Sequence, residues 1–277
     1  MQNLLELIGE AAPYVRAYDV VADNGVVHAR FKPEQERYAE TTLMSCSEAL
    51  RSMGIHGTLV CAAANPRKVK HYYLATRAEV RVLPVQASHA DVFHCEGRLV
   101  RMDSSQRFPV YTAAMTGFTS GGERYVDAEA DYVAFDEQQF VSVKGADDTP
   151  MAAWTSGRPS PYERPVSPMR MEWVRPGEAL RATLGELRHE DFAGHFPLRA
   201  LCPVSILGGH ACTLPCHFPG FEAYQITRCL LTCRSASRPG EPVDLTCVAE
   251  GAGRFVVTAL DARGKVLSTF YIDARPG

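Results

Sequence analysis

Apolar and polar residues alternate along much of the chain, which is the pattern of strands that bury one face. In residues 18–31 the alternation runs on both sides of Asn24-Gly25, a dipeptide that accepts the positive φ angles of a tight hairpin turn. Apolar residues then recur at helical spacing from about Glu40 to Met53, and this run ends at Gly54. The first half therefore predicts two strands and one helix, followed by strands at residues 71–85, 90–103, 107–118 and 123–136.

The second half of the chain repeats this order. Strands are expected within residues 171–187 and a helix near Pro203, followed by strands at residues 224–236, 242–251, 253–262 and 265–274. Tyr-Leu-Ala-Thr-Arg at 73–77 opens the first strand after the helix in one half, and Tyr-Gln-Ile-Thr-Arg at 224–228 does so in the other. Because similar runs occupy the same place in both orders, the sequence predicts an internal duplication.

Between the halves, proline, glycine and serine concentrate in residues 144–170, which hold five of the 18 prolines. Such a composition is typical of a linker. We therefore divide the chain into an N-terminal unit at 1–143, a Pro-rich linker at 144–169 and a C-terminal unit at 170–277. Both units have an ordinary domain size.

The order of elements in each unit predicts its architecture. One helix followed by a long antiparallel run suits a sheet that wraps around the helix, with edge strands that must be covered. Two units joined edge to edge would cover each other. The expected class is α+β, with two antiparallel sheets, each wrapped around a central helix, joined into one pseudo-dimer within the chain.

Composition narrows the possible functions. The 277 residues are 46% hydrophobic, so the chain can bury a core, and its formal net charge of −3 comes without a basic stripe. No nucleic-acid partner is expected. No membrane span is expected either, since no stretch approaches about 20 uninterrupted apolar residues, and residues 1–18 lack the pattern of a signal peptide. The nine cysteines are odd in number and lie in apolar segments, which favours reduced thiols and a cytoplasmic location.

The most informative motif lies just before the second helix. It reads Gly-His-Phe-Pro at 194–197, followed by Pro203 and Leu207. This string resembles the signature of the bacterial 3-hydroxyacyl-ACP dehydratases, which belong to the hotdog superfamily of thioesterases and dehydratases. The resemblance implies a double hotdog fold, in which two helix-wrapped units share an acyl-thioester site.

By this resemblance His195 is the catalytic base, and the N–H of Val204, just after Pro203, holds the thioester carbonyl. Gly194 and Phe196 are then expected beside the substrate. A helix N-terminus suits this role independently, because its free N–H groups stabilise a developing oxyanion. The structural alternative is a simple turn in which the ring of His195 is hydrogen-bonded to backbone.

The resemblance also requires an acidic residue on the helix, and the matching position here is Gly209. In the first half, Glu48 stands mid-helix at the family's distance from a Tyr-rich strand, and it is implied as the missing acid. Counting back from Glu48 to the place of a histidine gives Glu34, so this half lacks a base. In the family one site takes its histidine and its carboxylate from different units, which implies one composite site of His195 and Glu48. The alternative is that Glu48 faces solvent, as most helical glutamates do.

The predicted function is therefore a dehydratase-like lyase that acts on 3-hydroxyacyl thioesters in fatty-acid or polyketide-type biosynthesis. His195 would abstract the α-proton while Glu48 protonates the departing hydroxyl. One alternative is a hotdog thioesterase in which Glu48 activates water. Another is a non-catalytic acyl-binding or assembly partner with a degenerate site, since Gly209 lacks an acid and Ala200 replaces a family proline.

The expected partner is an acyl carrier protein or an acyl-CoA, both of which present the acyl group on phosphopantetheine. Arg199, Arg228 and Arg234 are candidates for contacts with its phosphate or with an acidic carrier. No other cofactor and no metal is expected, because the C-x3-C spacing of Cys212 and Cys216 is not typical of zinc sites. Association into a homo-oligomer stays open.

Overall fold

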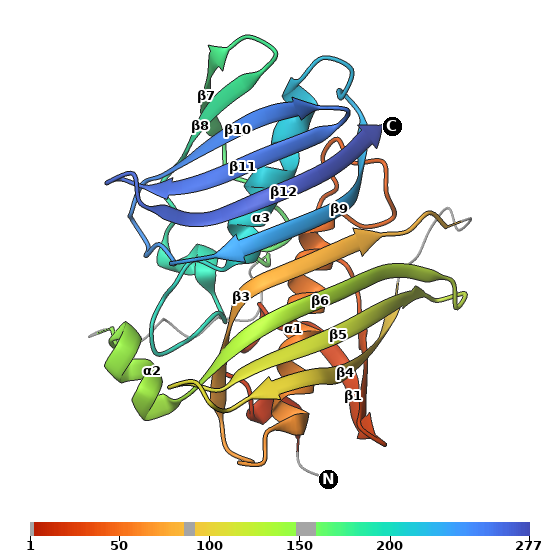
Figure 1. Ribbon diagram of the computed structural model, residues 1–277, viewed down its shortest axis with the longest axis vertical. Coiled ribbons are helices and arrows are strands. Elements are labelled where there is room, and N and C mark those ends of the chain that lie inside the picture. Colours follow the sequence, from red (N-terminus) through yellow and green to blue (C-terminus); the bar gives the residue numbers. More distant parts are fainter. Residues whose placement is uncertain (1–2, 86–91, 148–158) are drawn as a thin grey trace.

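The computed structural model describes residues 3–85, 92–147 and 159–277, and it has the predicted order of elements twice (Figure 1). The first half contains β1 (Ala17–Asp23), β2 (Val26–Phe31), α1 (Cys46–Ala64), β3 (His71–Val82), β4 (Phe93–Asp103), β5 (Val110–Thr119), β6 (Arg124–Asp136) and α2 (Glu137–Lys144). The second half contains β7 (Met169–Arg175), β8 (Ala179–Leu184), α3 (Val204–Thr213), β9 (Tyr224–Cys233), β10 (Val243–Gly251), β11 (Arg254–Asp261) and β12 (Val266–Pro276). Short 3-10 turns lie at Leu4–Glu6, His189–Phe192 and Leu214–His217.

The two units are joined edge to edge into one continuous antiparallel sheet. Its 12 strands follow the order β1-β2-β4-β5-β6-β3-β9-β12-β11-β10-β8-β7. The halves meet where β3 pairs with β9, so the two strands that carry the repeated five-residue run are neighbours at the seam. Read outward from the seam, both halves have the same strand order, which confirms the duplication at the level of topology. Joining the sheets leaves no unpaired edge at the centre of the molecule.

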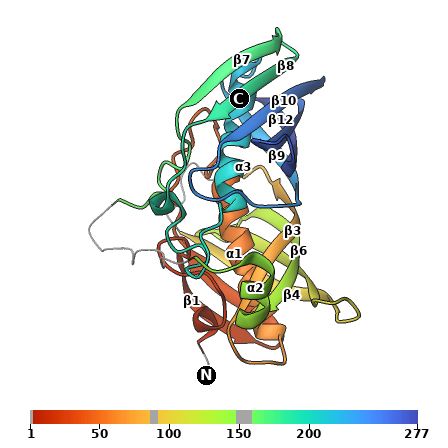
Figure 2. The ribbon, with the colours of Figure 1, turned by 90° about the vertical axis from the view of Figure 1, so that its left-hand side faces the viewer.

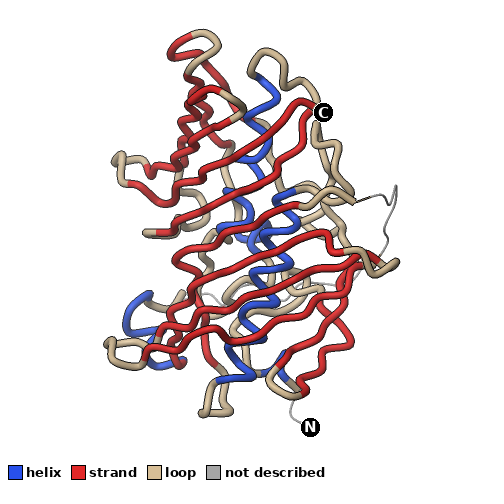
Figure 3. Tube along the Cα trace, turned by 45° about the vertical axis from the view of Figure 1, so that its right-hand side comes forward, coloured by secondary structure: helices blue, strands red, loops and turns tan. Residues whose placement is uncertain are grey.

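The two long helices lie along the same face of this sheet, one after the other (Figures 2 and 3). Helix α1 begins and ends later than the apolar spacing predicted, at Cys46 and Ala64. It begins there because the side chain of Ser45 accepts a hydrogen bond from the N–H of Glu48 and caps the helix. The helix continues past Gly54, its predicted end, to Ala64. Within it Gly57 is needed for packing, because a Cβ at that position would lie 2.1 Å from the hydroxyl of Tyr132.

The core runs through both halves as one large cluster of buried apolar side chains. A smaller cluster under α2 contains Tyr72, Phe140 and Phe196. Residues 148–158 of the predicted linker lie outside the described residues. The described part packs onto the body of the protein, since Tyr162 is fully buried and donates a hydrogen bond of 2.8 Å to the carbonyl of Ala193. No helix in the described ranges is long and apolar enough to cross a membrane.

Candidate active site

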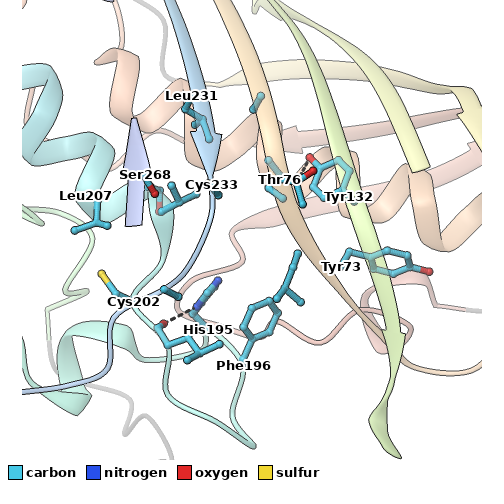
Figure 4. Close-up of a pocket in the computed structure, with 18 of the residues that line it drawn as sticks. Tyr73, Thr76, Tyr132, His195, Phe196, Cys202, Leu207, Leu231, Cys233 and Ser268 are labelled. Carbon is cyan, nitrogen blue, oxygen red and sulfur yellow. Dashed lines mark hydrogen bonds between the residues drawn. The ribbon is translucent and has the colours of Figure 1, made fainter. Parts of the chain in front are cut away.

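A cavity of about 170 Å³ lies at the seam between the two halves (Figure 4). Helix α1 and strands β3 and β6 line it from the first half, and α3, β9 and β12 line it from the second. Most of the lining is apolar, as an acyl chain requires. Its ionisable groups include Glu10, Tyr14, Lys144, His195 and Cys202.

His195 faces this cavity from the loop before α3, next to Phe196 (Figure 4). Its Nδ1 lies 2.9 Å from the carbonyl oxygen of Leu201. A carbonyl only accepts, so Nδ1 donates its hydrogen and the neutral ring keeps a lone pair on Nε2. Burial lowers the pKa of His195 to about 4, so the ring is neutral near pH 7. Among the residues that the structure describes, none is hydrogen-bonded to Nε2, which leaves this nitrogen available as a base.

The N-terminus of α3 reaches the same cavity. Val204, the first helical residue, and Ser205 both line it. The N-cap residue is Pro203, whose side chain cannot accept a hydrogen bond, so no side chain caps this helix. Its first N–H groups and the positive end of its dipole are therefore available to a carbonyl oxygen bound beside Val204.

Glu10 supplies a carboxyl group that the sequence analysis missed. It lines the cavity, is 6% exposed, and its Oε2 has no hydrogen-bond partner. Burial raises the pKa of Glu10 to about 8, although the N–H groups of Gly9 and Glu10 oppose this shift, so the group is protonated near pH 7. The ring of Tyr14 packs edge-on against His195 with the ring centroids 4.8 Å apart. The cavity thus holds a neutral base and a neutral acid.

The segment that carries Glu10 is clamped between β3 and the His195 loop. Ile8 forms a parallel bridge with His71, and the N–H of Ala11 donates a 2.8 Å hydrogen bond to the carbonyl of Gly194. Gly194 has φ +82, and a Cβ there would lie 2.3 Å from the carbonyl oxygen of Ala11. Gly194 therefore permits both the turn and the close approach that brings Glu10 and His195 to one cavity.

Glu48 is not brought to His195 in this structure. It is buried at the start of α1 but does not line the cavity. Its Oε1 accepts a hydrogen bond of 3.1 Å from Ser52 and lies 3.7 Å from Arg51, whose guanidinium also binds Glu34 at 2.6 Å. Burial raises the pKa of Glu48, and the charge of Arg51 opposes that shift. The expected solvent-facing alternative is equally unsupported, because Glu48 is 1% exposed.

The positions of the helix starts explain why the expected pairing fails. Glu48 is the third residue of α1, whereas Gly209 is the sixth residue of α3. Counted from the helix start, the residue of α1 that corresponds to Gly209 is Arg51. The family's spacing therefore selected a residue about one helical turn too close to the N-terminus of α1. The position in α1 that corresponds to the family's acid carries the guanidinium of Arg51 in this chain.

Two of the other residues predicted to bind substrate line the cavity and two do not. Phe196 and Val204 line it, whereas Gly194 and Pro203 are next to them in the chain but outside the lining. Of the three candidate arginines, Arg199 binds Asp147 at 2.6 Å, and Arg228 binds Glu79 at 2.9 Å and Asp273 at 3.3 Å. Only Arg234 lines the cavity, and it is exposed to solvent. Glu10 had one signal in the sequence, as a single carboxylate inside the short apolar run Ile8–Ala12.

Comparison with known proteins shows a similarity in fold to solved structures. No family model and no curated protein matches the chain. The fold is similar to a crystal structure of an acyl-ACP thioesterase from Bacteroides thetaiotaomicron VPI-5482, with a TM-score of 0.57 at 12% identity over 91% of this chain and 98% of the other. The 12:0-ACP thioesterase from Umbellularia californica matches with a TM-score of 0.56 at 10% identity over 93% of this chain and 100% of the other.

An acyl-CoA thioesterase II, TesB2, from Mycobacterium marinum matches in the same way, with a TM-score of 0.51 at 12% identity over 94% of this chain and 96% of the other. The large antiparallel sheet with its few helices is therefore similar to the fold of these thioesterase structures. At 10–12% identity the likeness concerns the fold alone.

Proposed function

We propose that this chain is an acyl-thioester hydrolase that acts in the cavity at the seam. The observation that carries the proposal is the neutral His195, with Nε2 free, in a buried apolar cavity beside the uncapped N-terminus of α3. The likeness of the fold to acyl-ACP and acyl-CoA thioesterases supports the same class of substrate and favours hydrolysis over dehydration.

In this proposal Nε2 of His195 takes a proton from water while the water oxygen attacks the thioester carbonyl carbon. The N–H of Val204 and the dipole of α3 stabilise the negative charge on the carbonyl oxygen. When the C–S bond breaks, the imidazolium returns its proton to the departing sulfur, so a carboxylic acid and a thiol leave. Glu10 is protonated near neutral pH, and its role in this scheme is to donate a hydrogen bond in the cavity without transferring its proton.

Dehydration of a 3-hydroxyacyl thioester is the second candidate, favoured by the Gly-His-Phe-Pro motif at 194–197 together with a protonated carboxyl group in the same cavity. His195 would take the α-proton, the C–O bond to the β-carbon would break, and Glu10 would give its proton to the hydroxyl as it leaves as water. Glu10 replaces Glu48 as the acid in this scheme. Glu10→Gln separates the two reactions, because an amide donates a hydrogen bond and cannot supply the proton.

The proposal also includes residues that would contact the carrier of the acyl group. Arg234 is exposed where it lines the cavity, and Lys144, also in the lining, is half-buried. Two cations beside an acyl cavity suit the phosphate of a phosphopantetheine arm, which CoA and acyl carrier proteins share. Arg234→Ala is expected to raise the KM for an acyl-CoA with little change in kcat.

The test is to incubate the protein with a saturated acyl-CoA and with a 3-hydroxyacyl-CoA, and to measure free thiol and 2-enoyl product separately. Hydrolysis predicts thiol release from both. His195→Asn should lower kcat/KM by about 100-fold or more, because the asparagine amide keeps the bond to Leu201 and removes the base. His56→Gln is the matched control, since His56 is another buried histidine bonded to one backbone carbonyl, at 3.0 Å, outside the cavity.

Enoyl product without thiol release would replace hydrolysis by dehydration. Equal activity of wild type and His195→Asn would refute the role of His195. Binding of an acyl-CoA with neither product would refute both reactions and leave the chain as an acyl-binding partner.

A further inference from the structure

Three cysteines from both halves converge in the core. The sulfur atoms of Cys46, Cys212 and Cys229 all lie within 4.8 Å of one another. Cys46 is the first residue of α1, Cys212 lies in α3, and Cys229 lies in β9 at the seam. All three side chains are at most 1% exposed. Neither the catalytic scheme nor the spacing of the cysteines in the sequence accounts for this cluster.

The strands show where the cluster lies relative to the cavity. The β3–β9 pairs run from Arg77 with Thr232 to Arg81 with Arg228, so the central pair is Glu79 with Leu230. A two-fold axis through this pair relates residues 151 positions apart, since 230 − 79 = 151. Cys229 therefore corresponds to Ala78, which lines the cavity.

The helices give the same answer. Cys46 and Val204 are each the first residue of their helix, and Gly54 and Cys212 are each the ninth. Val204 and Gly54 both line the cavity. Each of the three cysteines is thus the counterpart of a cavity-lining residue, and the cluster occupies the place where a second, symmetry-related cavity would lie.

A carboxylate lies beside the cluster. Oε2 of Glu40 accepts a hydrogen bond of 3.0 Å from the N–H of Cys46. Glu40 is 6% exposed, and within the described ranges no lysine or arginine forms an ion pair with it. A bound cation would offset the cost of a negative charge at this buried position.

We propose that Cys46, Cys212 and Cys229 form a buried zinc site that ties the two halves together, with Glu40 beside it as the hydrogen-bond acceptor for the N–H of Cys46. Tetrahedral zinc with Zn–S bonds of about 2.3 Å places its sulfur ligands about 3.8 Å apart, so the observed limit of 4.8 Å requires shifts of at most about 1 Å. Binding of Zn²⁺ releases the protons of the three thiols to solvent. This departs from the expectation that the chain binds no metal.

The measurement is the zinc content of the full chain, purified without chelator and passed over a desalting column. One zinc ion per chain is expected. Replacement of zinc by Co²⁺ should give the thiolate-to-cobalt charge-transfer absorption of a tetrahedral sulfur-rich site, and this reading on the wild type does not depend on any variant folding. Glu40→Gln is expected to weaken zinc binding.

Single variants then assign the ligands. Cys46→Ala, Cys212→Ala and Cys229→Ala should each lose the metal, whereas the matched control Cys247→Ala, a fully buried cysteine of β10 outside the cluster, should keep it. A wild-type protein that takes up neither Zn²⁺ nor Co²⁺, a disulfide between two of the three cysteines, or retention of metal in the three variants would each overturn the proposal.

Discussion

Glu10→Gln removes a carboxyl group that the fold holds in its protonated form. The pKa of this group rises from 4.5 to about 8 because of burial. Between these values the folded protein keeps a proton that the unfolded chain has lost. The free energy of unfolding must therefore fall as the pH rises through this window. Glutamine has no such proton, so the variant lacks this dependence.

The size of the effect follows from the two pKa values. Each pH unit between them corresponds to roughly 1.4 kcal/mol, so the full penalty far above pH 8 is on the order of 5 kcal/mol for a shift from 4.5 to about 8. Between pH 5 and pH 8, the stability of Glu10→Gln relative to wild type should rise by about 3 kcal/mol. Other titrating groups are present in both proteins and cancel in the difference.

The assay is urea denaturation of wild type and variant at several pH values between 5 and 8. Glu250→Gln is the matched control, because Glu250 is an exposed glutamate of β10 outside the cavity. If the free energy of unfolding of Glu10→Gln changes with pH in parallel with that of wild type over this range, the buried, protonated carboxyl group is refuted. They would also remove the acid from the dehydration scheme.

Other substitutions probe the surroundings of the site. Gly194→Ala should lower both the melting temperature, measured by circular dichroism, and the turnover rate. The reason is that φ +82 strains an alanine and that the new Cβ would meet the carbonyl of Ala11. Arg51→Met should lower the free energy of unfolding by about 3 kcal/mol, measured by urea denaturation, since the buried carboxylate of Glu34 loses this partner and keeps only Arg16 as an ion-pair partner among the described residues. Glu48→Gln should leave turnover of acyl-CoA unchanged, because its side chain lies outside the cavity.

Most of the fold was predictable because its elements are set by local patterns. Alternation and the Asn24-Gly25 turn gave the first hairpin, and the predicted strands of both halves all occur. The extent of α1 was not predictable, since Gly54 reads as an end signal although the helix continues to Ala64. Edge-to-edge joining of the two units was expected, but no local pattern encodes the choice of β3 and β9 as the paired strands.

The site was only partly predictable for the same reason. His195 and Val204 are close in sequence, and one motif brings them together before a helix. The carboxyl group of the cavity comes from a segment 185 residues earlier (195 − 10 = 185), and it arrives there through a backbone hydrogen bond between Ala11 and Gly194. The family's distance from its acid to the Tyr-rich strand selected Glu48, and this distance does not account for a helix that begins at Cys46.

The two halves keep the same strand order and have diverged where their helices begin. In the second half a proline without a capping side chain precedes α3, and small residues across the seam leave room for a ligand beside Val204. In the first half Ser45 caps α1, and the side chain of Cys46 meets two further thiols where the related cavity would lie. Duplicated strands need only preserve alternation to stay paired, whereas the positions related by the two-fold axis to Val204, Gly54 and Ala78 of the cavity hold the three thiols. The symmetry of the sheet is therefore compatible with one acyl site in each chain.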